Sequence, residues 1–352
     1  MPEAELVSVI MPVYNASEFV TASVESILFQ THDEFELIAV DDGSTDNSYE
    51  ILQDLERKDS RVRAFTKPNG GLSTALNLAI SKSNGQFIAR MDADDLSYRT
   101  RFEEQVNFLK SAENIALCSS AVDYTFFTGR VFPGGRKVRS PAEIKVLNLF
   151  SAVHVHPTVM FDARKIDRED LYYDEAYLVA EDYELFTRIG AKHETAILPD
   201  PKLLVRRQEH GNLTALLSKR IGSFHFQVTE RECALAGIVD AQPGVMDILT
   251  SDRPIDEAAA TILAKWLTPI ANFDGYRNEQ ADAYRFALSD FFDVVIDFNY
   301  TGNGQTFHIQ GNGVNYGTFN YNDVPVTLTS LAADCDTEYE FVIIDDATEN
   351  CS

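Results

Sequence analysis

Residues 87–95 constrain the fold more than any other stretch of this chain. An apolar run at 87–89 leads into three carboxylates within four residues, those of Asp92, Asp94 and Asp95. This pattern is typical of a buried strand that delivers acidic groups to the edge of a sheet. Because three adjacent carboxylates repel one another and raise each other's pKa, the edge requires a metal ion, an arginine or hydrogen-bond donors. The alternative interpretation is an acidic turn in which Asp95 caps the following helix.

The chain ahead of this stretch alternates between expected strands and expected helices. Strands are predicted at residues 7–15 and 35–40, and each is followed by a segment with helical spacing of its apolar residues, at 16–30 and 48–57. A strand, a helix and a second strand in this order form a βαβ unit, which predicts a parallel sheet. Parallel sheets bind ligands at the carboxyl ends of their strands, so we expect the site there.

Residues 61–65 form a third expected strand, and the loop at 67–73 opens another helix. The backbone N–H groups of Gly70 and Gly71 in this loop either approach a phosphate or form a plain turn. Three strand ends converge at the carboxyl edge and supply what a nucleoside diphosphate needs: an aromatic ring for the base, a carboxylate for its N–H group and a carboxylate for a divalent cation. The residues are Tyr14, Asp42 and Asp94.

Charge is distributed unevenly along the chain. The 352 residues carry a formal net charge of −25, which argues against a nucleic-acid partner because phosphate backbones are held by clustered Lys and Arg. Residues 240–352 hold 19 acidic residues against 4 basic ones, and no Lys or Arg follows Arg285. This change in composition predicts a separate C-terminal module.

Compartment and membrane contacts follow from apolar runs and cysteines. No apolar run approaches the roughly 20 residues that a membrane helix requires, and residues 1–5 lack the features of a signal peptide. We therefore expect a cytoplasmic protein without a transmembrane segment, compatible with peripheral membrane association. Cys118 and Cys233 are expected in the core, whereas Cys335 and Cys351 could pair only in an oxidising compartment.

Four motifs resemble the family-2 glycosyltransferases of the GT-A fold. They stand in that family's order and spacing: Val-Ser-Val-Ile-Met-Pro-Val-Tyr-Asn at 7–15, Val-Asp-Asp-Gly-Ser-Thr-Asp at 40–46, Asn-Gly-Gly-Leu-Ser at 69–73 and Ala-Arg-Met-Asp-Ala-Asp-Asp at 89–95. The resemblance extends over residues 6–231. It implies an α/β fold with a Rossmann-like mixed sheet flanked by helices, in a transferase domain that we assign to residues 1–235.

Two further regions lie beyond the resemblance. Good helix formers predict a helical extension at 236–290. Residues 291–352 contain five β-rich segments separated by Gly, Asn and Asp, which predicts a small acidic antiparallel sandwich. The segments are 291–300, 305–309, 316–321, 324–328 and 338–344. Its acids form either a calcium site or a solvated face, and the module binds carbohydrate, mediates assembly or does neither.

The resemblance implies a role for each donor-site residue. Tyr14 would stack on the uracil of the donor with Pro12 beside it, and Asp42 would accept the base N–H group. Asp41 would either share this role or only shape the turn. Asn69 and Gly71 would contribute to the same nucleotide-sugar site.

The resemblance also implies a divalent metal. Asp94 would bind Mn²⁺ or Mg²⁺ on the diphosphate, and Asp92 would lie near the ribose. Further along the chain, Arg207 and His210 are the nearest match to a pattern that reaches the diphosphate or the metal, although their spacing departs by one residue from the commonest form. A solvated basic edge is the alternative for this pair.

The second half of the resemblance supplies the acceptor side. Residues 153–161 read as a strand with His154 and His156 on one face, and the segment from His156 resembles one that borders the acceptor pocket. A zinc site needs a third ligand, which the neighbouring sequence lacks. The Glu181-Asp182 pair resembles the acidic motif of the family, in which Asp182 matches the base that takes the proton of the acceptor hydroxyl. The alternative is a helix start whose acids suit the helix dipole.

Together these observations predict an inverting, metal-dependent glycosyltransferase. It would move a sugar from a nucleotide donor, a UDP-sugar, to a saccharide or lipid-linked acceptor in cell-surface polysaccharide biosynthesis. Sugar nucleotidyltransferases use paired aspartates on a similar fold, but they have a Gly-rich, Arg-bearing loop after the first strand that residues 11–15 do not match. A non-catalytic carbohydrate or nucleotide-sugar binder, with the tail as its functional part, is the alternative. Retention of Asp42, Asp94 and Asp182 argues against a pure binder.

Overall fold

The computed structural model describes residues 5–125, 131–132, 141–148, 152–198, 203–207, 224, 227–232, 306–311, 314–320 and 341–345. The chain divides into two compact units, Met1–Phe224 and His225–Ser352. Within the part of the chain that the structure describes, no helix combines the length and the apolar character that crossing a bilayer requires. The boundaries of the three predicted regions remain predictions, and residues 236–290 lie outside the described residues.

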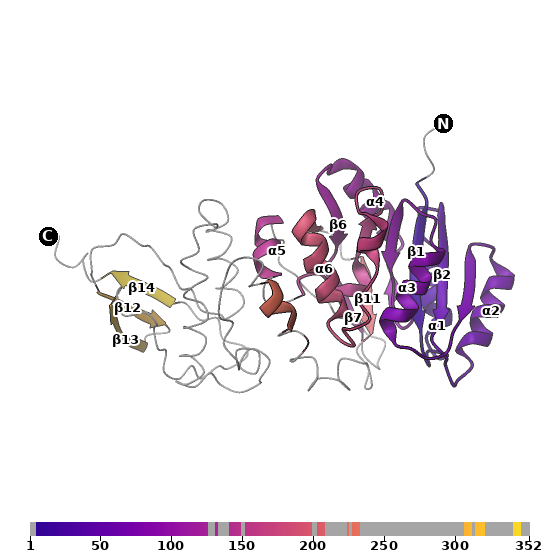
Figure 1. Ribbon diagram of the computed structural model, residues 1–352, viewed down its shortest axis with the longest axis horizontal. Coiled ribbons are helices and arrows are strands. Elements are labelled where there is room, and N and C mark those ends of the chain that lie inside the picture. The colour runs from indigo at the N-terminus through magenta and orange to yellow at the C-terminus, as the bar shows by residue number, and fades with distance from the viewer. Residues whose placement is uncertain are drawn as a thin grey trace. The chain divides into compact units, whose positions relative to one another are not determined.

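The first unit is built on a seven-stranded sheet with the strand order β10-β6-β9-β4-β1-β2-β3 (Figure 1). Its first four strands along the chain are β1 (Val7–Val13), β2 (Phe35–Asp41), β3 (Val62–Thr66) and β4 (Phe87–Arg90). They pair in parallel, with β1 between β2 and β4 and with β3 beside β2. The predicted βαβ arrangement is therefore confirmed.

Helices cover both faces of this sheet. Alternate residues of β1 point to opposite faces, as the period of a strand requires. Val9 and Met11 pack with α1 (Val20–Leu28), α2 (Ser48–Lys58) and α4 (Arg101–Ser111). Ile10 faces the other way and packs with α3 (Leu72–Lys82) and α6 (Glu181–Lys192). The strands are buried on both sides, which explains their nearly continuous apolar sequences.

The sheet becomes mixed in its second half. Strand β9 (Met160–Asp162) runs antiparallel between β4 and β6 (Ile115–Ser119), and β10 (Glu194–Ile197) lies parallel to β6. The mixed sheet implied by the resemblance is confirmed.

The expected strand at 153–161 was wrong over most of its length. The short 3₁₀ helix η1 (His156–Thr158) interrupts it, and the strand begins only at Met160. Pro157 has no N–H group to give to a sheet ladder, and the hydroxyl of Thr158 donates to the carbonyl of Val155 at 2.7 Å. Both features favour a turn at this point.

A second, four-stranded sheet has the order β5-β11-β7-β8. Its strands are β5 (Leu96–Ser97), β11 (Leu204–Arg207), β7 (Val122–Thr125) and β8 (Val131–Phe132). The interpretation of Asp95 as a helix cap was wrong, because β5 follows it and α4 begins only at Arg101. The remaining elements of the unit are α5 (Pro141–Leu147) and the 3₁₀ helix η2 (Arg168–Leu171).

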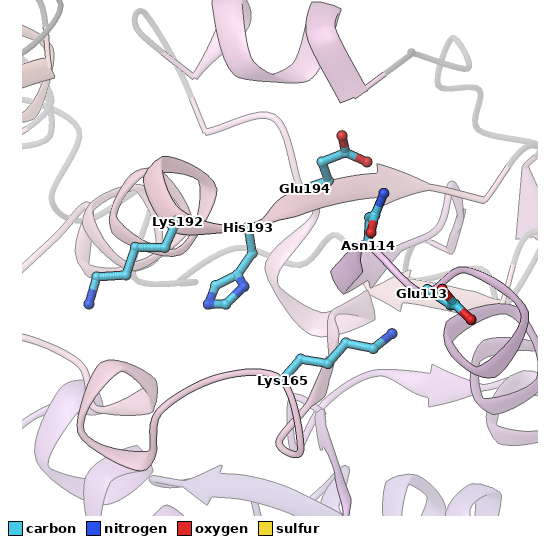
Figure 2. Close-up of a pocket in the computed structure, with 6 residues that line it drawn as sticks. All are labelled: Glu113, Asn114, Lys165, Lys192, His193 and Glu194. Atoms are coloured by element: carbon cyan, nitrogen blue, oxygen red, sulfur yellow. The ribbon is translucent and has the colours of Figure 1, made fainter.

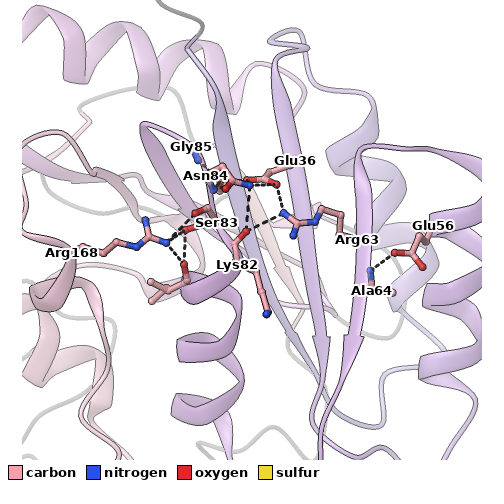
Figure 3. A network of polar contacts seen from close by, with 11 residues as sticks. Glu36, Glu56, Arg63, Ala64, Lys82, Ser83, Asn84, Gly85 and Arg168 are labelled. Carbon is pink, nitrogen blue, oxygen red and sulfur yellow. Dashed lines mark hydrogen bonds and ion pairs between the residues drawn. The ribbon is translucent and has the colours of Figure 1, made fainter.

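Polar contacts fasten the amino edge of the main sheet (Figure 3). The Glu36 carboxylate accepts from the hydroxyl of Ser8, from the backbone of Asn84 and from Arg63. Arg63 also donates to the carbonyl of Lys82 at 3.0 Å, and Arg168 donates to the carbonyl of Ser83 at 2.9 Å. Cationic side chains at the carbonyl end of α3 suit its dipole.

The described part of the second unit includes one antiparallel sheet with the order β13-β12-β14. Its strands are β12 (Thr306–Gly311), β13 (Val314–Asn320) and β14 (Phe341–Asp345). They correspond to three of the five β-rich segments predicted from the sequence. The other two segments, at 291–300 and 324–328, lie outside the described residues, as do Cys233, Cys335 and Cys351.

Candidate active site

The carboxyl ends of β1, β2 and β4 meet at one edge of the main sheet. In the register of the strands, Ile10 of β1 lies beside both Ile38 of β2 and Arg90 of β4. Tyr14 and Asp42 follow β1 and β2 directly, and Asp94 comes four residues after the end of β4, so the predicted convergence of these strand ends is confirmed. The buried Pro12 lies two residues before Tyr14, within β1.

Side chains from the loop after β2 hold the residues that follow Tyr14. The backbone N–H of Asn15 donates to Ser44, that of Ala16 to Ser48 at 2.8 Å, and that of Ser17 to Asp46 at 3.0 Å. Asn15 has a positive φ of 48°, a conformation that asparagine tolerates better than most residues. The ring of Tyr14 is 53% exposed, so its face is open to a planar ligand.

The loop after β3 folds around the carboxylate of Asp42. Gly70 N–H donates to Oδ1 at 3.0 Å, Gly71 N–H donates to Oδ2 at 2.8 Å, and Lys67 forms an ion pair with Oδ1. The side chain of Asn69 donates to the Asp42 carbonyl at 2.9 Å. A carboxylate has about four acceptor positions, and these three donors leave one position on Oδ2, in a side chain that is 7% exposed.

Two interpretations of this region can now be compared with the contacts. The N–H groups of Gly70 and Gly71 are used by Asp42, as in the plain-turn interpretation. Asp41 accepts from the backbone of Ser44 and from the hydroxyl of Thr66 at 3.0 Å, which matches the interpretation that it shapes the turn.

Asp92, Asp94 and Asp95 form an acidic cluster after β4. Their nearest carboxylate oxygens lie within 4.8 Å of one another. Burial, and next the charge of Asp92, raise the pKa of Asp94 to about 6, against the opposing effect of Arg90 and Arg206. Carboxylate oxygens at this spacing are the donors that Mn²⁺ and Mg²⁺ prefer, so the residues present fit a divalent cation.

Arg90 was not among the predicted site residues. Its side chain ends a buried strand, its residue is 2% exposed, and its Nη1 atom lies 2.5 Å from Oδ2 of Asp92. Burial by itself would lower the pKa of Arg90, but Asp92, Tyr173 and Asp95 raise it above its ordinary value. The guanidinium therefore remains charged. A charged residue inside an otherwise apolar run, directly ahead of three acids, is the sequence signal that could have identified it.

Glu181 and Asp182 begin α6, as predicted. Ala180 precedes them with a positive φ of 66°, and Oδ1 of Asp182 accepts from the backbone of Tyr183 at 2.7 Å. Burial raises the pKa of Glu181 to about 8, and the charge of Asp182 adds to this effect. The Glu181 side chain is 9% exposed, whereas that of Asp182 is 24% exposed. The two acids thus differ in their access to solvent.

The acidic cluster and the α6 acids share one electrostatic environment. Arg90 lowers the pKa of Glu181, and Asp92 raises it. The geometry agrees: the backbone N–H of Arg90, at the end of β4, donates to the carbonyl of Val159 directly after η1, and His156 of η1 lies 3.8 Å from Glu181 at the start of α6. The segments that carry the predicted metal ligand Asp94 and the predicted base Asp182 are therefore neighbours, and that the two residues serve one site stays a prediction.

The two histidines of the interrupted strand are buried in different settings. His154 contacts the hydroxyl oxygens of Ser119 and Thr195, at 2.7 and 3.0 Å. His156 contacts the hydroxyl of Tyr173 at 2.8 Å and faces the α6 acids. Neither belongs to a cluster of metal-ligating side chains in the described part of the chain.

The last two predicted residues are described only in part or not at all. Arg207 ends β11, and nothing is described of its side chain, while His210 lies outside the described residues. Their proposed contact with the diphosphate or the metal stays a prediction. Arg206, beside Arg207, lowers the pKa of Asp94, so a cation from β11 does act on the acidic cluster.

A cavity of about 350 Å³ lies at the opposite end of the sheet (Figure 2). Glu113, Asn114, Lys165, Lys192, His193 and Glu194 line it, at the amino ends of β6 and β10. The ammonium of Lys165 donates to the carbonyls of Leu109, Ala112 and Ile115 at 2.9 to 3.0 Å. This lysine closes the turn into β6, and no residue predicted for the nucleotide or the metal lines the cavity.

The fold is that of the GT-A glycosyltransferases. The chain aligns with the TarS structure of S. aureus, residues 1–349 in complex with UDP-GlcNAc, at a TM-score of 0.51 and 20% identity over 82% of this chain and 81% of that one, a likeness of fold. The model of the family described as Glycosyl transferase family 2 matches residues 8–167. The chain belongs to this family.

Relatives with similar sequences carry glycosyltransferase names. An uncharacterized glycosyltransferase of Haemophilus influenzae is 31% identical over 205 residues, which are 53% of this chain and 80% of that protein. An uncharacterized glycosyltransferase of Rickettsia felis is 40% identical over 139 residues, 36% of this chain, and the match spans only 23% of that protein. The putative teichuronic acid biosynthesis glycosyltransferase TuaG of Bacillus subtilis is 39% identical over 105 residues, 30% of this chain and 42% of TuaG.

Proposed function

We propose that this protein is an inverting, metal-dependent glycosyltransferase that moves a sugar from a UDP-sugar to a hydroxyl group of a saccharide or lipid-linked acceptor. The observation that carries the proposal is the placement of Arg90. Its side chain pairs with Asp92, and its backbone N–H donates to the carbonyl of Val159, directly after η1. His156 of η1 lies 3.8 and 3.9 Å from Glu181 and Asp182, so the acids proposed for a metal diphosphate and those proposed for proton transfer lie on neighbouring segments. A transfer reaction needs both sets of acids close to the sugar carbon at which one bond breaks and the other forms.

The donor nucleotide would bind over the ends of β1 and β2. The exposed ring of Tyr14 offers a face for stacking on the base, and the remaining acceptor position on Asp42 suits an N–H group of the base. Asn69 and Gly71 shape this acceptor by their contacts with Asp42. The complex of TarS with UDP-GlcNAc supports a uridine nucleotide as donor.

Asp94, with Asp92 and Asp95 beside it, would hold Mn²⁺ or Mg²⁺ against the diphosphate. A divalent cation there supplies charge neutralisation for the departing nucleoside diphosphate. Arg90 holds Asp92 in place through its ion pair, and Arg207 and His210 would contact the same group from β11 and the residues after it. The structure of GalNAc-T7 with UDP, GalNAc and Mn²⁺, at a TM-score of 0.50 and 14% identity, supports a metal of this kind in the fold.

Asp182 would act as the general base. It is the more exposed of the two α6 acids, and the buried Glu181 keeps its proton below about pH 8, so the two carboxyls can take different roles. The acceptor oxygen attacks the anomeric carbon as Asp182 takes its proton, and the bond from that carbon to the diphosphate oxygen breaks. Attack from the face opposite the leaving group inverts the anomeric centre.

We further propose that the enzyme works in the cytoplasm, with peripheral membrane association when its acceptor is lipid-linked. TuaG, named for teichuronic acid biosynthesis, supports a role in cell-surface polysaccharide synthesis.

The test is a nucleotide-sugar assay on the full chain. A thermal-shift screen of UDP-, GDP- and other nucleotide sugars, with and without Mn²⁺, first identifies the donor by its stabilisation of the fold. Release of UDP is then measured for the wild type, for Asp182→Asn and for Asp54→Asn, a control on the exposed face of α2. We expect Asp182→Asn to lose at least about 100-fold in turnover with donor affinity intact, and the control to match the wild type. Metal-independent turnover, or full turnover in Asp182→Asn, overturns the proposal.

A further inference from the structure

His156 lies between a tyrosine and the two acids of α6. Its Nε2 atom is 2.8 Å from the hydroxyl of Tyr173, and its Nδ1 atom is 3.8 Å from Oε1 of Glu181 and 3.9 Å from Oδ2 of Asp182. The ring also meets Phe186 edge to face, with centroids 5.8 Å apart. The imidazole is therefore held in one orientation, with one nitrogen toward Tyr173 and the other toward the carboxylates.

Tyr173 is itself fixed from a different element. Asn77 of α3 accepts from the backbone N–H of Tyr173 at 2.8 Å and donates to its carbonyl at 2.9 Å. The tyrosine is 2% exposed, so its hydroxyl hydrogen needs an acceptor inside the protein. Among the described residues, Nε2 of His156 is the hydroxyl's one hydrogen-bond partner.

These contacts determine which nitrogen of His156 carries the proton. Burial lowers the pKa of His156 well below its ordinary value, and the charges of Arg90 and Arg206 lower it further, so the ring is neutral. Burial raises the pKa of Tyr173, which keeps the phenol protonated and able to donate. If the tyrosine donates to Nε2, the single ring proton is on Nδ1. That N–H group then points at Glu181 and Asp182.

The charged and titratable groups around the ring come from three elements and the Tyr173 segment. Arg90 and Asp92 belong to β4 and the residues after it, Arg206 to β11, Tyr173 to the segment after η2, and Glu181 and Asp182 to α6. The separation of 3.8 to 3.9 Å from Nδ1 to the carboxylates exceeds hydrogen-bond length by less than about 1 Å, a gap that catalytic contacts close when substrate binds.

We propose that Tyr173 and His156 are positioning residues for the base of the transfer reaction: Tyr173 fixes the tautomer of His156, and the Nδ1–H group of His156 then orients the Asp182 carboxylate. This inference rests on the proposed role of Asp182. It adds two neutral side chains that act in series: Asn77 of α3 holds the backbone of Tyr173, Tyr173 acts on His156, and His156 acts on Asp182. The same logic, in which a buried partner sets the tautomer of a histidine, operates in hydrolase triads.

Ring ¹⁵N chemical shifts test the proposed tautomer without any enzymatic activity. The full chain is labelled with ¹⁵N-histidine, and the His156 signal among the seven histidines is assigned by its loss in His156→Asn. We expect wild-type His156 to be the Nδ1–H tautomer, and Tyr173→Phe to increase the Nε2–H form. Tyr172→Phe is the matched control, because it removes the same atom from the adjacent residue. A wild-type Nε2–H tautomer, or no change in Tyr173→Phe, overturns the positioning proposal whether or not the protein transfers sugar.

Kinetics then test its consequence. We expect Tyr173→Phe to lower kcat about tenfold without changing KM for the donor, as loss of an orienting partner does at other histidine sites. The acid limb of its kcat profile should move to higher pH, because a lost donor raises the pKa of the carboxylate that it served. His156→Asn, whose amide can replace Nδ1–H, should keep more activity than His156→Leu. Equal loss in these two variants, or an unmoved acid limb in Tyr173→Phe, contradicts the positioning role even if Asp182→Asn is inactive.

Discussion

Nη1 of Arg90 lies 2.5 Å from Oδ2 of Asp92, and this ion pair stands at the meeting point of the two acidic groups of the site. The arginine is almost fully buried, while the Asp92 side chain is 27% exposed. Arg101 fixes the backbone here, since its guanidinium donates to the Arg90 carbonyl at 2.7 Å. Arg90 is therefore the cation that the sequence required next to three carboxylates.

Replacing Arg90 should lower the stability of the fold. In Arg90→Met, Asp92 loses its ionic partner, and we expect the free energy of unfolding to fall by about 1–3 kcal/mol. Arg63→Met is the matched control, because the Arg63 side chain pairs with Glu36 but is 34% exposed, and its loss should cost no more than about 1 kcal/mol. Urea unfolding measures the free energy of unfolding of both variants. Equal losses would mean that the Arg90 pair is no stronger than a surface contact.

Asp94 should matter for the metal and not for the fold. We expect Asp94→Asn to abolish the stabilisation of the wild type by Mn²⁺, which reaches about 2.7 kcal/mol when the metal concentration is 100 times its dissociation constant. In EDTA the variant should be at least as stable as the wild type, because it loses the repulsion between Asp94 and Asp92. Thermal unfolding with EDTA and with Mn²⁺ checks both statements. A variant that still responds fully to Mn²⁺ would remove Asp94 from the metal site.

Glu181 should make stability depend on pH. Its pKa is raised from 4.5 to about 8 by burial and by Asp182, so between these values the folded protein binds a proton that the unfolded chain has released. The unfolding free energy contributed by this group is therefore complete below pH 4.5 and declines as the pH rises toward 8. Glu181→Gln resembles the protonated acid, so the stability of this variant relative to the wild type should increase as the pH rises across that range. Urea unfolding at about pH 5 and about pH 9 measures the difference, and a gap that stays constant contradicts the shift.

Two glycines near Asp42 should respond differently to alanine. Gly43 has a φ of +70°, and a Cβ atom there would lie 2.7 Å from the backbone nitrogen of Asn69. Gly71 has a φ of +92°, but a Cβ atom would meet nothing within 4 Å. Gly71→Ala should cost only backbone strain of about 1–3 kcal/mol. Gly43→Ala should lower the free energy of unfolding by more than Gly71→Ala does, and it should weaken UDP binding, because Asn69 must move. Urea unfolding and UDP titration measure these effects. If Gly71→Ala proves the more harmful of the two, the loop at Asn69 adjusts to the added Cβ atom.

The first half of the fold was predictable because each of its helices and strands is indicated by the pattern of residues within its own segment. Alternating apolar strands and amphipathic helices indicated β1 to β4, and their parallel pairing placed Tyr14, Asp42 and Asp94 at one edge. The acids of α6 were likewise recognisable as a helix start. The position of β9 was not, because three residues paired antiparallel between β4 and β6 carry too short a pattern to indicate a partner.

The missed residues of the site act through contacts distant in sequence. Tyr173 meets His156 across 17 positions, and Asn77 reaches Tyr173 across 96. No periodicity links such residues, so only the fold brings them together. The strand expected at 153–161 also gave no sign of this arrangement, because η1 begins at His156. Both histidine rings meet Phe186 edge to face, but they hydrogen-bond to different partners, His154 to Ser119 and His156 to Tyr173.

Strand β9 also limits how the first unit can move. It hydrogen-bonds to β4, after which Asp92, Asp94 and Asp95 follow, and to β6, so the two halves of the first unit are joined within one continuous sheet. A sheet of this kind does not hinge between its strands without breaking its ladder. If the proposed site closes around a substrate, we therefore expect the movement in the loops at the carboxyl edge, and the length and composition of these loops become the natural targets for changing acceptor preference.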